Sequence, residues 1–178
     1  MDNDPVVVSW CGEISKVPFA VRLFLNNVTN SYISHGEIQC GRALNSRKWS
    51  AQLTKVLRLE FVDCIKNYKS KQLSKWLALA WFKRCMCGLA VVSFQKESRP
   101  FFATIEDLVV IRENRHNGFG GAILSWIEEE VRRHDIDLIF LESGLRNQGA
   151  HHFFEKNQYR PLSKVMVKVC SKKKGIRK

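Results

Sequence analysis

The sequence has no run of about eighteen consecutive apolar residues, the length that a membrane-spanning helix needs. Its first thirty residues carry Asp2, Asp4 and Glu13 instead of a basic segment followed by an apolar one, so they do not resemble a secretory signal. Repeats and low-complexity segments are also missing before the last eight residues. These absences favour a soluble cytoplasmic protein that is not exported and has no membrane partner.

The six cysteines lack the spacing of a metal site. Only one residue separates Cys85 from Cys87, and no second pair follows at the distance that a zinc site needs. Most of the cysteines lie inside apolar patterns, which is typical of reduced core residues in the cytoplasm. We therefore expect no metal.

Acidic residues are scarce in the segment 42–84, where Glu60 and Asp63 stand against eleven Lys and Arg. The whole chain has a formal net charge of +12, and the last eight residues contribute five positive charges. This pattern is typical either of a solvated surface with a frayed tail or of a surface that attracts an acidic partner, RNA or protein. A second copy of the chain, in a homodimer, is another possible partner.

A chain of 178 residues with 45% hydrophobic residues can build one domain with a substantial core. Hydrophobic periodicity predicts two amphipathic helices, over 17–32 and 50–68, with irregular structure between them. We expect a helical region at 13–75, a sheet region at 76–170 and a basic flexible tail at 171–178.

Extended segments dominate the second region. A helix that begins near Gly118 leads to a strand at Ile136–Glu142, so the strands on either side of this helix should run parallel. A short helix at 147–156 and a last strand at Lys164–Cys170 complete the order. Before them, three strands are predicted to form an antiparallel meander: Trp76–Phe82, Cys87–Phe94 and Phe101–Ile111.

A glycine-rich loop follows the third strand of this meander. The strand ends in the apolar run Leu108–Ile111, a short charged loop follows, and Gly118, Gly120 and Gly121 open the next helix. The first N–H groups of a helix have no intrahelical partner and lie at the positive end of its dipole, so they bind anions. Glycines let a bulky anion approach the backbone. The order of strand, glycine loop and helix therefore predicts a phosphate-binding site.

Spacing separates the motif classes that use such a loop. A Walker A loop needs Lys followed by Ser or Thr after the glycines, and neither pair is present. A dinucleotide fingerprint needs a glycine where this chain has Ile123. The sequence satisfies instead the pattern [QR]-x-x-G-x-[GA], at Arg115, Gly118 and Gly120, after a strand that carries L-x-V.

This motif resembles the coenzyme A pyrophosphate loop of the GNAT superfamily of acyltransferases. The predicted order of elements over about residues 13–170 resembles that family too, which implies a mixed α/β fold (α+β) with a splayed central sheet and flanking helices. The family motif N-x-x-A-x-x-x-Y-x-x-x-G-F is also similar to five residues here, of which the first two match it and the other three depart from it: Asn147, Ala150, Phe154, Gln158 and Tyr159.

The resemblance implies an acyl-CoA-dependent N-acyltransferase, most simply an N-acetyltransferase that uses acetyl-CoA. A backbone N–H near Val109 or Val110 is then the expected donor to the thioester oxygen. The residues that the resemblance assigns to cofactor binding are Leu108, Val109, Val110, Arg115, His116, Asn117, Gly118, Phe119, Gly120, Gly121 and Asn147.

An amine attacks a thioester only when it is neutral, so a base or a chain to water must take its proton. Glu106 is the candidate catalytic base, because it lies on the strand that carries the loop, where several family members place a basic catalytic side chain. Period-two alternation predicts that it shares a face with Thr104 and Leu108, opposite Asp107. A solvated carboxylate at the strand edge is the alternative, and Glu142 on the next strand is a second candidate.

The phenol that protonates the coenzyme A thiolate in the family corresponds to Phe154, which cannot donate a proton. Three explanations stay open. The thiolate leaves unaided, since a thiol pKa is about 8.5, or Tyr159 or His151 substitutes, or the chain binds the cofactor without turning it over. We favour the first. The rival functions are a non-catalytic module that binds coenzyme A or nucleic acid, and an interaction protein with an empty loop.

The acceptor amine is not evident from the sequence. The basic segment suits an acidic acceptor such as RNA, charged tRNA or an acidic protein, and it argues against polycationic aminoglycosides. In the family, the region after the first helix often lines the acceptor groove. Here that region carries His35, Gly36 and Glu37, which we interpret as a turn.

Overall fold

The computed structural model describes residues 4–97, 99–168 and 170. The first half of the chain forms β1 (Val7–Trp10), α1 (Val17–Asn27), α2 (His35–Gln39), β2 (Ala43–Asn45), β3 (Lys48–Trp49) and α3 (Leu53–Lys69). The second half forms β4 (Lys75–Phe82), β5 (Cys85–Gln95), β6 (Phe102–Val110), α4 (Phe119–Arg133), β7 (Leu138–Leu141) and α5 (Gln148–Lys156). No helix within these described residues is long and apolar enough to span a membrane.

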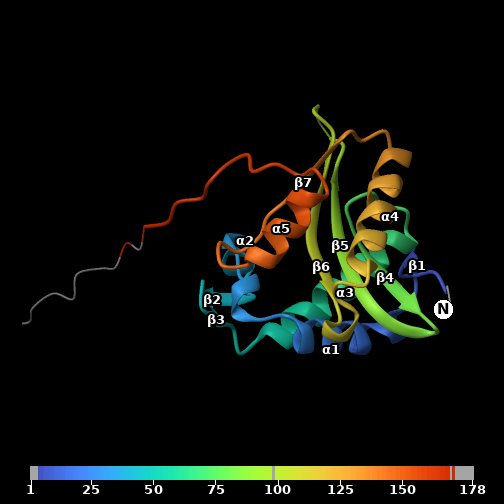
Figure 1. The fold of residues 1–178 in the computed structure, drawn as a ribbon, viewed down its shortest axis with the longest axis horizontal. Helices are drawn as coiled ribbons and strands as arrows, with labels where there is room; N and C mark the ends of the chain where they lie inside the picture. The colour runs from blue at the N-terminus through green and yellow to red at the C-terminus, as the bar shows by residue number, and fades with distance from the viewer. Residues whose placement is uncertain (1–3, 98, 169, 171–178) are drawn as a thin grey trace, which may run out of the picture.

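The large sheet has the strand order β1–β4–β5–β6–β7, and β2 with β3 forms a separate small hairpin (Figure 1). The pairs β1–β4, β4–β5 and β5–β6 are antiparallel, whereas β6 and β7 are parallel. The predicted meander and the parallel pair joined by a helix are therefore confirmed, as is the mixed α/β fold class.

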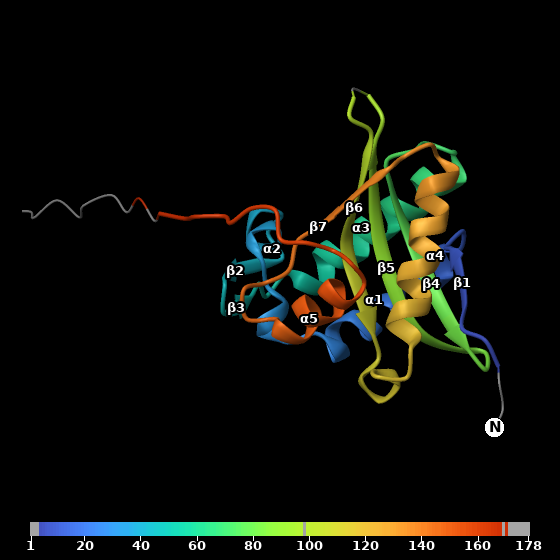
Figure 2. The same ribbon diagram turned by 45° about the horizontal axis from the view of Figure 1, so that its top comes forward.

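Helices cover both faces of the large sheet (Figure 2). On one face, α1 and α3 bury Phe24 and Phe61 against Leu77 and other residues of β4 and β5. On the other face, α4 buries Ile127 and its neighbours. The central strands β4 and β5 are thus buried from both sides, which explains their nearly continuous apolar sequence.

The segment between the two long helices is more ordered than predicted. The first helix ends at Asn27 rather than near residue 32, since the β-branched pair Val28-Thr29 follows two asparagines, all weak helix formers. The turn expected at 35–37 is the first part of α2. That helix begins with a capping box, in which the side chains of Ser34 and Glu37 bond to backbone N–H groups.

The predicted last strand at Lys164–Cys170 is wrong over its described residues, 164–168 and 170, which pair with no described strand. Met166 and Val167 are exposed, and the chain leads away from the sheet (Figure 1). Apolar residues favour a strand in sequence, but a strand also needs a hydrogen-bonded neighbour, which the pattern does not reveal. The basic tail at 171–178 lies outside the described residues.

Candidate functional site

The parallel pair of β6 and β7 is short. The two strands pair over four positions, from Phe102 opposite Leu138 to Ile105 opposite Leu141. After this pair β7 ends, while β6 continues to Val110, and the two chain segments diverge (Figure 2). We call this opening the splay. Among the described residues, no strand pairs with residues 106–110 on that side, so backbone N–H groups that point there, such as that of Val110, are available to a ligand.

A β-bulge marks the start of the splay. Along β5, Val92 lies opposite Ile105 but Val91 lies opposite Asp107, so Glu106 is an extra residue in β6. A bulge interrupts period-two alternation. The prediction that Glu106 and Asp107 lie on opposite faces is therefore wrong, because both side chains bond to residues on the face covered by α1 and α3.

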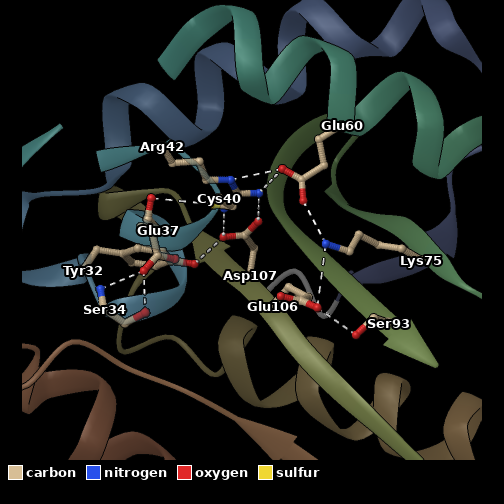
Figure 3. A network of polar contacts seen from close by, with 10 residues as sticks. All are labelled: Tyr32, Ser34, Glu37, Cys40, Arg42, Glu60, Lys75, Ser93, Glu106 and Asp107. Atoms are coloured by element: carbon tan, nitrogen blue, oxygen red, sulfur yellow. Dashed lines mark hydrogen bonds and ion pairs between the residues drawn. The ribbon is translucent and has the colours of Figure 1, made fainter. Parts of the chain in front are cut away.

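Glu106 belongs to a polar network on this face (Figure 3). Its Oε1 atom accepts a hydrogen bond from Ser93 Oγ at 2.8 Å and lies 3.7 Å from Lys75 Nζ. Burial lowers the pKa of Lys75, but the carboxylates of Glu60 and Glu106 raise it by more, so the pKa lies above its ordinary value. The side chain of Glu106 is 36% exposed. No described residue bonds to its Oε2 atom, which leaves this oxygen open to an acceptor.

Asp107 is the buried anion of the same network. The Arg42 guanidinium donates to both of its carboxylate oxygens at 2.9 Å and also donates to Glu60. Tyr32 Oη donates to Asp107 Oδ1 at 2.9 Å. Burial alone would lower the pKa of Arg42, but Asp107 and Glu60 raise it above its ordinary value. The Arg42 guanidinium therefore stays charged at neutral pH, and its bonds to Asp107 attach the segment after α1 to the bulge.

A second polar cluster joins the end of β7 to the start of α2. Glu142, the residue after β7, accepts hydrogen bonds through Oε1 from Ser34 Oγ and from the Gly36 N–H, the latter at 2.7 Å. Its other oxygen, Oε2, lies 2.6 Å from His35 Nδ1. The sequence suggested Glu142 as a second candidate base. In the structure, both carboxylate oxygens of Glu142 are instead bonded to donors from the segment 34–36.

The glycine loop leads from β6 into α4. Gly118 has a φ of +81°, a left-handed conformation that favours glycine. At Gly121 an added Cβ would meet no atom within 4 Å, whereas at Gly120 it would lie 3.3 Å from the Phe153 ring. The N–H groups from Phe119 to Gly121 have no intrahelical acceptor, so they are available to an anion.

Arg115 has a structural role that the motif does not reveal. Its guanidinium donates to the carbonyl oxygen of Val110 at 3.1 Å and to that of Asn27 at 2.6 Å. Burial and the nearby Arg112 lower its pKa. Arg115 therefore ties the glycine loop to both β6 and the end of α1.

The other sequence-predicted cofactor residues lie on either side of this loop. Leu108, Val109 and Val110 form the end of β6 beyond its last pair with β7. His116 and Asn117 lie within the loop, where His116 has a positive φ of 65°. Asn147 is the N-cap residue of α5, and its carbonyl oxygen accepts the N–H groups of Ala150 and His151. Because Phe153 packs against Gly120, α5 contacts the loop.

The Phe154 ring contacts two aromatic rings, that of Phe153 on α5 and that of Tyr159 just after this helix. It contacts the Tyr159 ring edge-on, with centroids 5.6 Å apart. Tyr159 Oη donates to Glu128 on α4 at 3.2 Å, and burial together with Glu128 raises the Tyr159 pKa. This hydroxyl borders a cavity of about 320 Å³ near Ile139 at the start of β7. It is thus held away from the splay, which disfavours Tyr159 as a substitute acid.

The part of the chain that the structure describes contains no group of three or more His, Cys, Asp and Glu that could hold a metal ion. The model of the acetyltransferase (GNAT) family matches residues 44–159, about two thirds of the chain. A curated relative, the aminoalkylphosphonate N-acetyltransferase of Salmonella typhimurium, is 28% identical over 69 residues. That match covers 39% of this chain and 45%, less than half, of the relative.

Two solved structures have a similar fold. The PaiA N-acetyltransferase of Thermoplasma acidophilum, in complex with coenzyme A, has a TM-score of 0.68 at 14% identity, over 86% of this chain and 88% of that one. An aminoglycoside acetyltransferase from an uncultured soil metagenomic sample has a TM-score of 0.60 at 16% identity, over 97% and 99%. At these identities the similarity shows the fold alone.

Proposed function

Because the chain belongs to the GNAT acetyltransferase family, we propose that it moves an acetyl group from acetyl-CoA to the amine of an acceptor bound at the splay. The observation that carries this proposal is the continuity of the site. The free edge of β6 leads directly into a glycine loop and the N-terminus of a helix, over the single stretch 106–121.

The cofactor uses backbone groups in this proposal. The pantetheine arm pairs with Leu108–Val110, as another strand would, and the thioester oxygen accepts an N–H from this strand. The pyrophosphate binds the first turn of α4, where the N–H groups from Phe119 to Gly121 and the helix dipole favour an anion. Arg115 supports this arrangement by holding the loop in place.

Glu106 is the proposed general base. It lies at the mouth of the splay, where the thioester and the incoming amine meet, and the hydrogen bond from Ser93 orients its carboxylate. Its free oxygen takes a proton from the acceptor ammonium, directly or through a water molecule, and so produces the neutral amine that attacks the thioester.

The charge distribution favours an acceptor that carries an anionic group besides its amine. The outer side of α3 displays the exposed residues Lys55, Arg58, Lys66 and Lys69, whose spacing places them on one side of the helix. The curated relative is named for substrates with a phosphonate group. An amine on RNA, on an acidic protein or on a small phosphonate or phosphate meets this requirement.

The test measures coenzyme A release and the mass of the product with a panel of amines in matched pairs, such as 2-aminoethylphosphonate and propylamine. We expect transfer, with a preference for the anionic member that weakens as salt is added. In Glu106→Gln, kcat should fall about a hundredfold or more, with unchanged affinity for acetyl-CoA. Glu155→Gln, on the exposed side of α5, is the matched control. Tight binding of acetyl-CoA without acetylation of any amine would favour a non-catalytic module instead.

A further inference from the structure

Acetyl transfer removes two protons from the acceptor nitrogen, and Glu106 accounts for one of them. The ammonium loses the first proton before attack. The nitrogen becomes cationic again when it bonds to the acetyl carbon, and it then loses the second. The departing thiolate of coenzyme A needs a proton to become a thiol. Phe154 has no proton to give, and the Tyr159 hydroxyl is bonded to Glu128. One group that takes the second proton and delivers it to sulfur would meet both needs.

His35 has the orientation that such a group requires. Its Nδ1 atom lies 2.6 Å from Glu142 Oε2, so Nδ1 carries a hydrogen, and the proton acceptor of the imidazole is then Nε2. No residue in the described part of the chain bonds to Nε2, and the side chain is 38% exposed. The arrangement is that of a histidine whose tautomer is set by a carboxylate.

The segment that carries His35 crosses from one arm of the splay to the other. Tyr32 Oη bonds to Asp107 on β6, and Ser34 and its neighbours bond to Glu142, directly after β7. Neighbouring strands lie about 4.8 Å apart, and the last pair between β6 and β7, Ile105 with Leu141, precedes one attachment point by two residues and the other by one. The imidazole is therefore held beside the opening, on the arm opposite Glu106.

Close backbone packing fixes this segment. A Cβ added at Gly36 would lie 3.2 Å from Glu142 Oε1, and one added at Gly144 would lie 2.5 Å from the Ile33 carbonyl oxygen. Arg146 donates to the Asn30 carbonyl oxygen at 3.1 Å. These contacts join the loop after β7 to the loop after α1, so His35 is positioned by tertiary structure rather than by a free turn.

We propose that His35 is the proton shuttle of the transfer and that Glu142 is its positioning residue, an inference that rests on the proposed function. When the amine nitrogen bonds to the acetyl carbon, the carbonyl electron pair moves to oxygen and Nε2 takes the proton of the cationic nitrogen. The carbonyl re-forms, the carbon–sulfur bond breaks with its electron pair on sulfur, and the imidazolium gives its proton to that sulfur. The products are an amide and a thiol, and His35 returns to its neutral form.

The experiment compares His35→Ala and His35→Gln with the wild type, using acetyl-CoA and the best amine of the panel. We expect kcat to fall about a hundredfold in both variants, with unchanged affinity for acetyl-CoA. Added imidazole should restore part of the activity of His35→Ala, because the deleted ring leaves space for it, and none of that of His35→Gln. His152→Ala, exposed on α5, is the matched control and should behave like the wild type.

Glu142→Gln separates positioning from proton transfer. The amide cannot hold Nδ1–H as firmly as a carboxylate, so kcat should fall without any rescue by imidazole. If the wild type acetylates amines and His35→Ala keeps full activity, the shuttle is overturned while the transfer stands. The shuttle is also overturned if His35→Ala is folded and binds acetyl-CoA but has lost its activity and regains none of it when imidazole is added. A wild type that acetylates no amine would overturn both proposals.

Discussion

The two sides of the splay are built in different ways. The cofactor side consists of backbone groups from one continuous stretch, residues 108–121, in which strand, loop and helix follow directly. The acceptor side consists of side chains from distant segments, such as Ser34 and Glu142, which are 108 positions apart. The first side therefore depends on local conformation, whereas the second depends on the tertiary fold. Changes on the cofactor side should alter affinity alone, and changes on the acceptor side should alter stability and kinetics together.

Arg42→Ala should have the largest effect, because it breaks the acceptor side at its buried ion pair. Asp107 is 1% exposed, and removal of one partner from a buried pair costs about 3–5 kcal/mol of unfolding free energy. Urea denaturation measures this loss. Lys66→Ala is the matched control, since its pair with Asp63 is exposed and contributes less than about 1 kcal/mol. Equal losses in the two variants would refute the structural role of the network.

Gly121→Glu should weaken the cofactor side without a loss of stability. The new carboxylate competes with the pyrophosphate, so the affinity for acetyl-CoA should fall at least about tenfold, or 1.4 kcal/mol. Stability should hold or rise slightly, because glutamate favours a helix over glycine by about 1 kcal/mol and an acid suits the first helical turn. Position 121 is preferable to 120, where a side chain would meet Phe153.

Calorimetric titration with acetyl-CoA and thermal unfolding of the same sample check both parts of this prediction. Gly121→Ala is the control and should bind the cofactor nearly as the wild type does. An unchanged affinity in Gly121→Glu would mean that the pyrophosphate lies elsewhere.

Phe154→Tyr should have the smallest effect. If His35 already protonates the thiolate, a phenol at position 154 adds little, and kcat should change less than about threefold. Steady-state kinetics at saturating acetyl-CoA measure it. A rise of more than about tenfold would indicate that the leaving thiolate lacks a donor in the wild type, which would count against His35 as the shuttle.

The same contrast explains what could be predicted from the sequence. The glycine loop and the parallel strands around α4 follow from local pattern and from chain direction, and both predictions of structure were correct. The bulge at Glu106 could not be foreseen, because an extra residue is defined only by its pairing with β5. The contacts of Arg42 with Asp107 and of His35 with Glu142 could not be predicted either, because each joins residues that are far apart in the sequence.

One missed feature did have a sequence signal. Ser34 and Glu37 have the spacing of a capping box, which marks the start of a helix. The glycine between them led to the interpretation as a turn, although Gly36 lies there because Glu142 approaches the backbone closely. The prediction of a strand at Lys164–Cys170 was wrong for a different reason. The hydrophobic pattern there favours a strand, but its described residues have no neighbouring strand to pair with.

A crystal structure with bound acetyl-CoA tests the central claim most directly. We expect the pyrophosphate at the first turn of α4 and the thioester between the two arms of the splay, with its carbonyl oxygen within hydrogen-bonding distance of the Val110 N–H, because Val109 pairs with Leu89 of β5. Acetyl-CoA bound elsewhere, for instance in the cavity beside Tyr159 between α4 and β7, with the splay empty, would contradict it.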